Sequence, residues 1–309
     1  MPQSREASVF TQRIGPSRRS GQLGLIASFL AASGFLQLHA EPRSITERQQ
    51  LLLQAAANPK RHGVWASDTY QEVADERPGL QQTARTNSLT LGYDQLVTSR
   101  WTVGFALTQQ TQRSELLQDS TRRSGNGLIA SLYGSYAPLP FLTFPVSLGL
   151  GHSKTSQDRV AEGQALHGDF SASLITVAAG MNLLVPLQPL FLSNSLQLSY
   201  ASADIGSFVE RWPGQEVATP AQATSSTQLH LSTKASLWTD GKLWPYASLK
   251  YSRDLQRNPV DSDPDQLQWG LGLDVLHGAG WAGGLGYSRV IGRQGIDDQS
   301  LTLTLRKSY

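Results

Sequence analysis

Apolar and polar residues alternate along most of this chain, from about residue 64 to its last residue. In Trp101–Thr108, every second residue is large and apolar, and the positions between them hold Thr, Gly or Ala. The same alternation recurs in Leu267–Val275 and in Leu301–Leu305. Successive side chains of a β-strand point to opposite faces, so a period of two predicts strands with one apolar and one polar face.

The alternation predicts about twelve strands, which makes the chain an all-β protein. Their approximate ranges are 64–75, 86–97, 100–111, 126–137, 141–153, 168–183, 190–203, 226–239, 243–253, 266–276, 281–291 and 299–309. Short connections are expected at 98–99, 137–140, 186–189, 240–242 and 277–280, and long polar loops at 112–125, 154–167, 204–225 and 254–265. An even strand number with alternately short and long connections is typical of antiparallel barrels that cross the bacterial outer membrane.

Ser44–Pro59 has a different pattern, which predicts a short helix. Ser44 and Glu47 form a capping box, good helix formers fill the middle, and Pro59 ends the segment. At a rise of ~1.5 Å per residue, the helix would be about 20 Å long, close to the height of an outer-membrane barrel. Inward glycines such as Gly270 and Gly272 either leave room for this helix inside the barrel or relieve strand curvature.

The first forty residues are typical of a secretory signal peptide. Arg18 and Arg19 precede Leu23–Leu38, an apolar stretch too short to span a membrane comfortably. Cleavage is expected between Ala40 and Glu41. The alternative is a buried amino-terminal helix. The chain is thus divided into a signal peptide (1–40), a linker helix (41–60) and a barrel (61–309).

Charge and composition narrow the function classes. Residues 1–40 hold four arginines and one glutamate, so removing their +3 from the formal +2 leaves a mature chain near −1. The charge therefore gives no reason to expect a nucleic-acid partner. The chain has no cysteine, which excludes disulfides and thiolate sites. Because a barrel must cross the inner membrane unfolded, we expect the general secretory route rather than the twin-arginine route.

The last strand and the aromatic residues beside the short turns predict how the barrel meets the membrane. Leu301, Leu303, Leu305 and Tyr309 share one face, and this ending resembles the terminal strand that the β-barrel assembly machinery reads in outer-membrane proteins. Lys307 interrupts the apolar face but can extend its amine to the interface. We also predict an interfacial belt of Trp101, Tyr136, Phe141, Phe191, Trp238, Trp244 and Trp281. The alternative is that aromatics simply favour strand ends next to turns.

Several segments, taken in order, resemble the β-domain of autotransporters, the translocators of type V secretion. They are Gly63–Trp65 after the helix, Asn87–Asp94 (NSLTLGYD), Trp101–Phe105 (WTVGF), Leu132–Tyr136 (LYGSY), Arg159 and Phe208–Glu210. The resemblance covers nearly all of the chain from Ser44 to Tyr309. It implies a twelve-stranded outer-membrane barrel with the linker helix in its lumen. Expected partners are outer-membrane lipid, periplasmic chaperones and the assembly machinery, and we expect a monomer.

The chain differs from the family in one respect. Only Glu41–Arg43 separate the predicted signal from the helix, so we expect no passenger. The protein would then be a translocator remnant, a porin-like pore or a scaffold for surface loops on a Gram-negative cell. Self-cleavage within the helix is not expected, because Asn58 is followed by Pro59. Some charged or titratable residues are expected to face the lumen, where they would either tune a pore or hydrogen-bond to each other or to the helix: Asp94, His230, Lys234, Lys250 and Asp274.

Two other functions remain open. One is a phospholipase- or protease-like barrel hydrolase active at the external loops, with His152-Ser153 or Asp297-Asp298 as candidates. Adjacent residues on a strand point to opposite faces, which argues against the first pair, and acidic pairs are common in solvated turns. The other is a secreted water-soluble β protein. The histidines have no metal-ligand spacing, and we predict no catalytic residue, metal or cofactor.

Overall fold

The computed structural model describes residues 62–77, 81–117, 120–161, 164–187, 189–212, 215–237, 239, 242–258, 264–277, 280–293 and 295–309. The predicted signal peptide with its Ala40–Glu41 cleavage site and the predicted helix at Ser44–Pro59 lie outside these residues. Among the residues described, no helix is long and apolar enough to cross a membrane.

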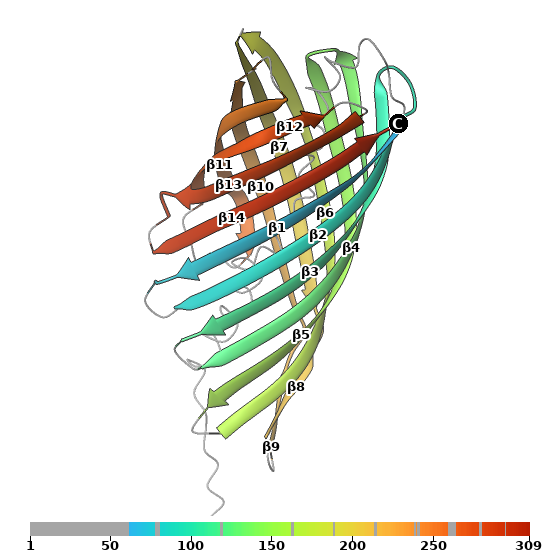
Figure 1. Ribbon diagram of the computed structural model, residues 1–309. Helices are drawn as coiled ribbons and strands as arrows, with labels where there is room; N and C mark the ends of the chain where they lie inside the picture. The colour runs from blue at the N-terminus through green and yellow to red at the C-terminus, as the bar shows by residue number, and fades with distance from the viewer. Residues whose placement is uncertain are drawn as a thin grey trace, which may run out of the picture.

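Twelve antiparallel strands close into a strongly tilted barrel (Figure 1). They are β1 (His62–Asp75), β2 (Gln82–Leu96), β3 (Trp101–Leu116), β4 (Thr121–Leu139), β5 (Leu142–Ala161), β6 (Gln164–Leu187), β7 (Leu190–Ile205), β10 (Gln222–Leu237), β11 (Leu243–Asn258), β12 (Asp265–His277), β13 (Trp281–Ile291) and β14 (Ile296–Ser308). Two further strands, β8 (Phe208–Trp212) and β9 (Gln215–Thr219), form a hairpin between β7 and β10. The predicted fold class is confirmed.

The barrel closes where its first and last strands pair. β1 and β14 pair from Gly63↔Ser308 to Asp75↔Ile296. At the end of this ladder, the Tyr309 amide donates a hydrogen bond of 2.9 Å to the His62 carbonyl. Every strand of the barrel therefore has a neighbour on both sides, which leaves no free sheet edge along the ladder. We call the end of the barrel that carries Tyr309 the short-turn end, and the opposite end the long-strand end.

The prediction of long polar loops at the long-strand end is wrong. β3 runs to Leu116 and β4 begins at Thr121, while β5 and β6 are separated only by residues 162–163. The region 204–225 holds the β8–β9 hairpin, and β11 continues to Asn258. Strand pairing needs only backbone hydrogen bonds. Beyond the lipid both faces of a strand become polar, so the two-residue hydrophobic signal disappears while the ladder continues.

The two faces of the strands have opposite polarity. Leu91, Phe105 and Leu303 point outward and are 55%, 55% and 59% exposed. Polar side chains such as Thr108 and Ser131 are buried on the inner face. An apolar exterior of this extent is what a barrel in lipid requires, and it is incompatible with a water-soluble protein. The water-soluble alternative is therefore wrong.

Candidate functional site: the barrel lumen

Among the described residues, one side of the lumen is open. Residues of β6, β7 and β10–β14 line a cavity with about 1170 Å³ of empty space, part of which is open to solvent. Most of the lining side chains are Ser, Thr, Asn or Gln, and glycines such as Gly284 and Gly286 lie among them. The strands place these residues here because they occupy the alternate positions between outward leucines. In the described part of the chain, these small polar side chains leave an open polar space rather than a packed core.

The charged residues of this cavity are mostly paired. Lys234 Nζ lies 2.7 Å from Asp274 Oδ2 and 3.8 Å from the centre of the Tyr246 ring. The Tyr246 ring lies against Gly272, where a Cβ atom would be only 2.4 Å from it. Lys250 also lines the cavity. The ion pair neutralises one lumen cation, which favours the prediction that inward charges contact each other.

His230 is buried between two serines. Its Nδ1 and Nε2 lie 2.8 Å from Ser252 Oγ and 3.1 Å from Ser199 Oγ. Both ring nitrogens are thus in hydrogen-bonding positions within the barrel lining, and the imidazole spans three neighbouring strands. His230 therefore links three strands of the barrel lining and has a structural role.

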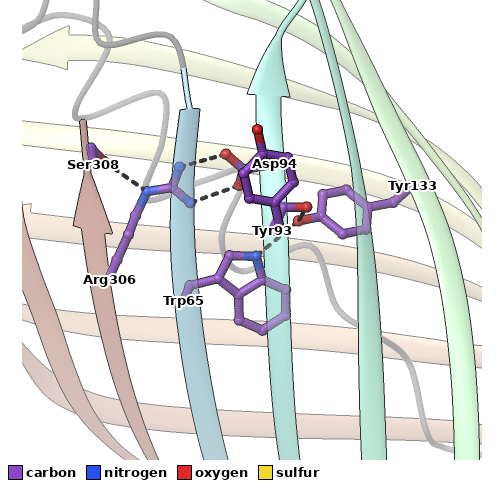
Figure 2. Close-up of polar contacts among 6 residues, drawn as sticks. All are labelled: Trp65, Tyr93, Asp94, Tyr133, Arg306 and Ser308. Carbon is purple, nitrogen blue, oxygen red and sulfur yellow. Dashed lines mark hydrogen bonds and ion pairs between the residues drawn. The ribbon is translucent and has the colours of Figure 1, made fainter.

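The opposite side of the lumen, next to the closing seam, is filled. Arg306 donates two hydrogen bonds to Asp94, of 2.8 and 2.7 Å, and a third of 3.2 Å to Ser308 Oγ (Figure 2). The side chains of Arg306 and Asp94 are only 6% and 1% exposed. Gly63 provides the space, since a Cβ atom there would lie 2.5 Å from the guanidinium. The pair joins β14 to β2 across β1.

Two aromatic side chains extend this filled region. Trp65 Nε1 donates a hydrogen bond of 2.8 Å to Tyr133 Oη, which donates one of 3.2 Å to the Tyr93 carbonyl (Figure 2). Each ring covers the glycine paired with it on the neighbouring strand: Trp65 covers Gly92, and Tyr133 covers Gly104. A Cβ atom at Gly92 would be 2.2 Å from the indole. These inward glycines thus make room for neighbouring aromatic rings.

A third cluster lies inside the barrel at the long-strand end. Phe208 of β8 packs against Phe170 with ring centres 5.0 Å apart. Glu210 accepts a hydrogen bond of 2.7 Å from Gln157 and forms an ion pair with Arg159. Arg159 and Phe208–Glu210, both part of the family resemblance, therefore meet in space. This cluster fixes the base of the β8–β9 hairpin to β5 and β6.

The predicted interfacial belt divides into two groups. Trp101, Phe141 and Trp281 are exposed on the outer face, and Tyr136 packs against Trp101 at 4.8 Å between ring centres. For these four residues, contact with the interface stays a prediction. Trp238 lies outside the described residues.

Phe191 and Trp244 do not belong to an outward belt. They are only 7% and 3% exposed, and their rings stack 6.0 Å apart. Both lie on the inner face, since Phe191 shares the face of Ser193, and Trp244 that of Tyr246. Proximity to a turn does not decide the face; odd or even position along the strand does. Their assignment to the belt is corrected.

The last strand has the expected orientation. Leu301, Leu303 and Leu305 are exposed on the outer face, as is Tyr309. The Tyr309 ring also stacks on His62, with ring centres 5.6 Å apart. Lys307 Nζ lies 4.9 Å from the centre of the Trp281 ring and 5.5 Å from that of Tyr309. Recognition of this strand by the assembly machinery stays a prediction.

The two candidate hydrolase pairs are divided between the two faces of their strands. His152 is exposed, whereas Ser153 is buried on the inner face. Asp297 pairs with Arg289 at 2.8 Å, and Asp298 is buried and accepts a hydrogen bond from Gln71. Neither pair converges on one point. In the described part of the chain, no group of three or more His, Cys, Asp or Glu residues could hold a metal ion.

Sequence reasoning missed the filled side of the lumen. In the sequence, Trp65 and Tyr133 stand out only as parts of family-like segments, and nothing marks Arg306 as a partner of Asp94. Glycines inside strands rather than in turns, such as Gly92 and Gly104, were the available signal, because they mark positions that a neighbouring ring can cover.

Comparisons with known proteins agree with this architecture. The family model of the autotransporter β-domain matches residues 64–288. The translocator domain of NalP from Neisseria meningitidis is 18% identical, with a TM-score of 0.77, and the match covers 92% of this chain and 99% of that chain. The β-domain of BrkA from Bordetella is 16% identical, with a TM-score of 0.66, and the match covers 81% and 100%.

The transport unit of AIDA-I from Escherichia coli is 11% identical, with a TM-score of 0.56, and the match covers 94% of this chain and 99% of that chain. No curated protein matches the chain. At these identities the solved structures support the fold, and the family follows from the match over most of the chain. The chain belongs to the autotransporter β-domain family, and it is an outer-membrane barrel of translocator type.

Proposed function

We propose that this barrel provides a hydrophilic passage across the outer membrane. The observation that supports this proposal is the cavity on the β10–β14 side, lined by small hydroxyl and amide side chains. Such a lining can hydrogen-bond to water or to an extended polypeptide without holding either tightly. The paired Lys234 and Asp274 add little net charge, so a passage with weak selectivity is expected.

The test is single-channel recording of the refolded mature protein in planar bilayers. Ser232→Trp places a large ring in the cavity and should lower the conductance. Thr233→Trp places the same ring on the outer face of the same strand and should leave the conductance unchanged.

A second arm removes Ile45–Asn58, which should raise the conductance if the predicted helix obstructs the lumen. Closed channels with and without this segment would contradict the proposal.

The route of assembly is also a proposal. We infer export through the general secretory pathway, periplasmic chaperoning, and insertion as a monomer by the β-barrel assembly machinery. The outward Leu301, Leu303, Leu305 and Tyr309 support this role for the last strand. Deleting Tyr309 should reduce the heat-modifiable protein in the outer membrane, whereas Ser308→Ala should not. An undiminished amount after the deletion would show that Tyr309 is dispensable as a signal.

We propose no catalytic activity and no nucleic-acid partner for the barrel. The first statement is supported by the separation of His152 from Ser153, and of Asp297 from Asp298, onto opposite faces. A lipase or protease activity of the purified barrel that is lost in Ser153→Ala or Asp298→Asn would refute it.

A further inference from the structure

A group of cations lies on the outer surface of β2–β5, just beyond the outward-facing leucines toward the long-strand end. Arg85 and Arg113 are directly opposite each other on β2 and β3. Lys154 lies on the outer face of β5, opposite Asn126 of β4. Asn126 lies in the same row as Thr111 of β3, next to the arginines. We call Arg85, Arg113 and Lys154 the basic patch.

The basic patch lies at the height of a lipid headgroup. Arg85 lies four residues from the outward Leu89, on the side of the long-strand end. Lys154 lies four residues from the outward Leu150, on the same side. At ~3.3 Å per residue and a tilt of ~45°, four residues raise a side chain by about 9 Å. The cations thus lie just beyond the hydrocarbon, within reach of an interfacial phosphate.

Within the described ranges, two of the three cations lack a matching acid. Arg85 donates a hydrogen bond of 2.9 Å to Glu72, and its side chain is still 63% exposed. Neither Arg113 nor Lys154 forms an ion pair with a residue in the part of the chain that the structure describes. Like charges directly opposite each other on a sheet are destabilising. The arrangement is therefore costly unless an external anion joins it.

The other side of the barrel makes a useful contrast. There, outward arginines face carboxylates on the neighbouring strand: Arg289 lies 2.8 Å from Asp297, and Arg253 lies 3.8 Å from Asp265. Arg113 and Lys154 differ from these arginines, because neither has a carboxylate partner among the described residues.

We propose that the basic patch binds the phosphates of a phosphorylated glycolipid of lipid A type in the outer leaflet. Arg presents a planar fork of donors that matches phosphate oxygens, and Lys adds a mobile point charge. Asn87, Thr111 and Asn126, which form the adjacent row, supply neutral donors for the sugar or phosphate oxygens. The inference rests on the proposed outer-membrane passage and, in addition, on the long-strand end facing outward.

The test measures binding of fluorescent diphosphoryl lipid A to the full mature protein in detergent micelles. Arg113→Gln combined with Lys154→Gln should weaken the affinity about tenfold or more, since each cation near an anionic surface contributes appreciably. The matched control, Arg253→Gln combined with Arg289→Gln, should change it less than about twofold, because those cations already have carboxylate partners. Heat-modifiable migration confirms that each variant is folded.

Further arms separate the lipid source and the orientation. Lipid A without phosphates should bind the unaltered protein as weakly as diphosphoryl lipid A binds the double variant. Equal affinity of both double variants for diphosphoryl lipid A would overturn the proposal, and so would equally tight, patch-dependent binding of phosphatidylglycerol.

The chain has no cysteine, so Asp158→Cys can be labelled selectively. Labelling on intact cells supports the assumed orientation, and labelling only after permeabilisation overturns it. Bilayer conductance does not enter any of these outcomes.

Discussion

The two sides of the lumen follow the same sequence rule but differ in structure. On the seam side, Trp65, Tyr133 and Arg306 fill the space between the strands and are linked by hydrogen bonds (Figure 2). On the cavity side, the same inward positions hold Ser195 and Ser232, and the described residues leave an open space. Alternation decides which side chains face inward. The volume of those side chains then decides whether that part of the barrel is plugged or open.

The ion pairs of the two sides differ in their access to water. Arg306 and Asp94 are 6% and 1% exposed, whereas Lys234 and Asp274, which border the cavity, are 18% and 8% exposed. A charge left without its partner is far more costly where water cannot replace the partner. The same chemical change should therefore have a large effect at the seam and a small one at the cavity.

Removing one charge of the seam pair should have the largest effect. Arg306→Met leaves the Asp94 carboxylate buried without its cation, so the free energy of unfolding should fall by about 3–5 kcal/mol. Urea unfolding in detergent, followed by tryptophan fluorescence, measures the change. Adding Asp94→Leu to Arg306→Met should restore much of the stability. If Arg306→Met alone is as stable as the unaltered protein, the seam pair is not the constraint that its burial implies.

Adding a methyl group at matched glycines should have an intermediate effect. Gly92→Ala brings a Cβ atom 2.2 Å from the Trp65 indole, which Tyr133 holds in place, so unfolding should become easier by about 1–3 kcal/mol. Gly286→Ala meets only the Tyr246 hydroxyl at close range, and the cavity gives that side chain room to move. Its effect on the urea midpoint should be distinctly smaller. Equal losses for the two variants would mean that the open side is packed as tightly as the seam.

Removing the cavity cation should have the smallest effect on stability. Lys234→Met leaves Asp274 next to a hydrated space, so the loss should stay near the ~1 kcal/mol of a solvent-accessible pair. Because a lumen cation is lost, the reversal potential in a salt gradient should shift toward cation selectivity. Lys307→Met, on the outer face, is the control and should leave the reversal potential unchanged. An unaltered potential in Lys234→Met would place the ion path away from this cavity.

The sequence predicted the strands well where the lipid imposes a signal. Outward leucines such as Leu91 and Leu303 mark strands at the short-turn half, and the terminal strand pairs with the first as expected. Toward the long-strand end, the polar strands carry no such signal. Their continuation to residues such as Leu116 and Asn258 depends on backbone pairing, which the side-chain pattern does not report.

The site was less predictable because its contacts join distant strands. Asp94 and Arg306 are 212 positions apart, and Trp65 and Tyr133 are 68 apart. These contacts depend on how the strands are shifted against one another around the closed barrel, and no single segment contains that information. Asp94 could be placed in the lumen from its position alone, but its partner could not. The inward Trp244 shows that proximity to a turn does not predict which face an aromatic residue occupies.

The unequal strand lengths give the barrel a slanted rim. β6 has 24 residues and β14 has 13; at ~3.3 Å per residue and a tilt of ~45°, they rise about 55 Å and 30 Å. β5, β6, β8 and β9 extend furthest at the lower end of the view in Figure 1. In the proposed orientation, with the long-strand end outward, a molecule leaving the lumen would meet a tall flank on one side and a low flank on the other. The proposed exit would then be asymmetric and would direct such a molecule sideways.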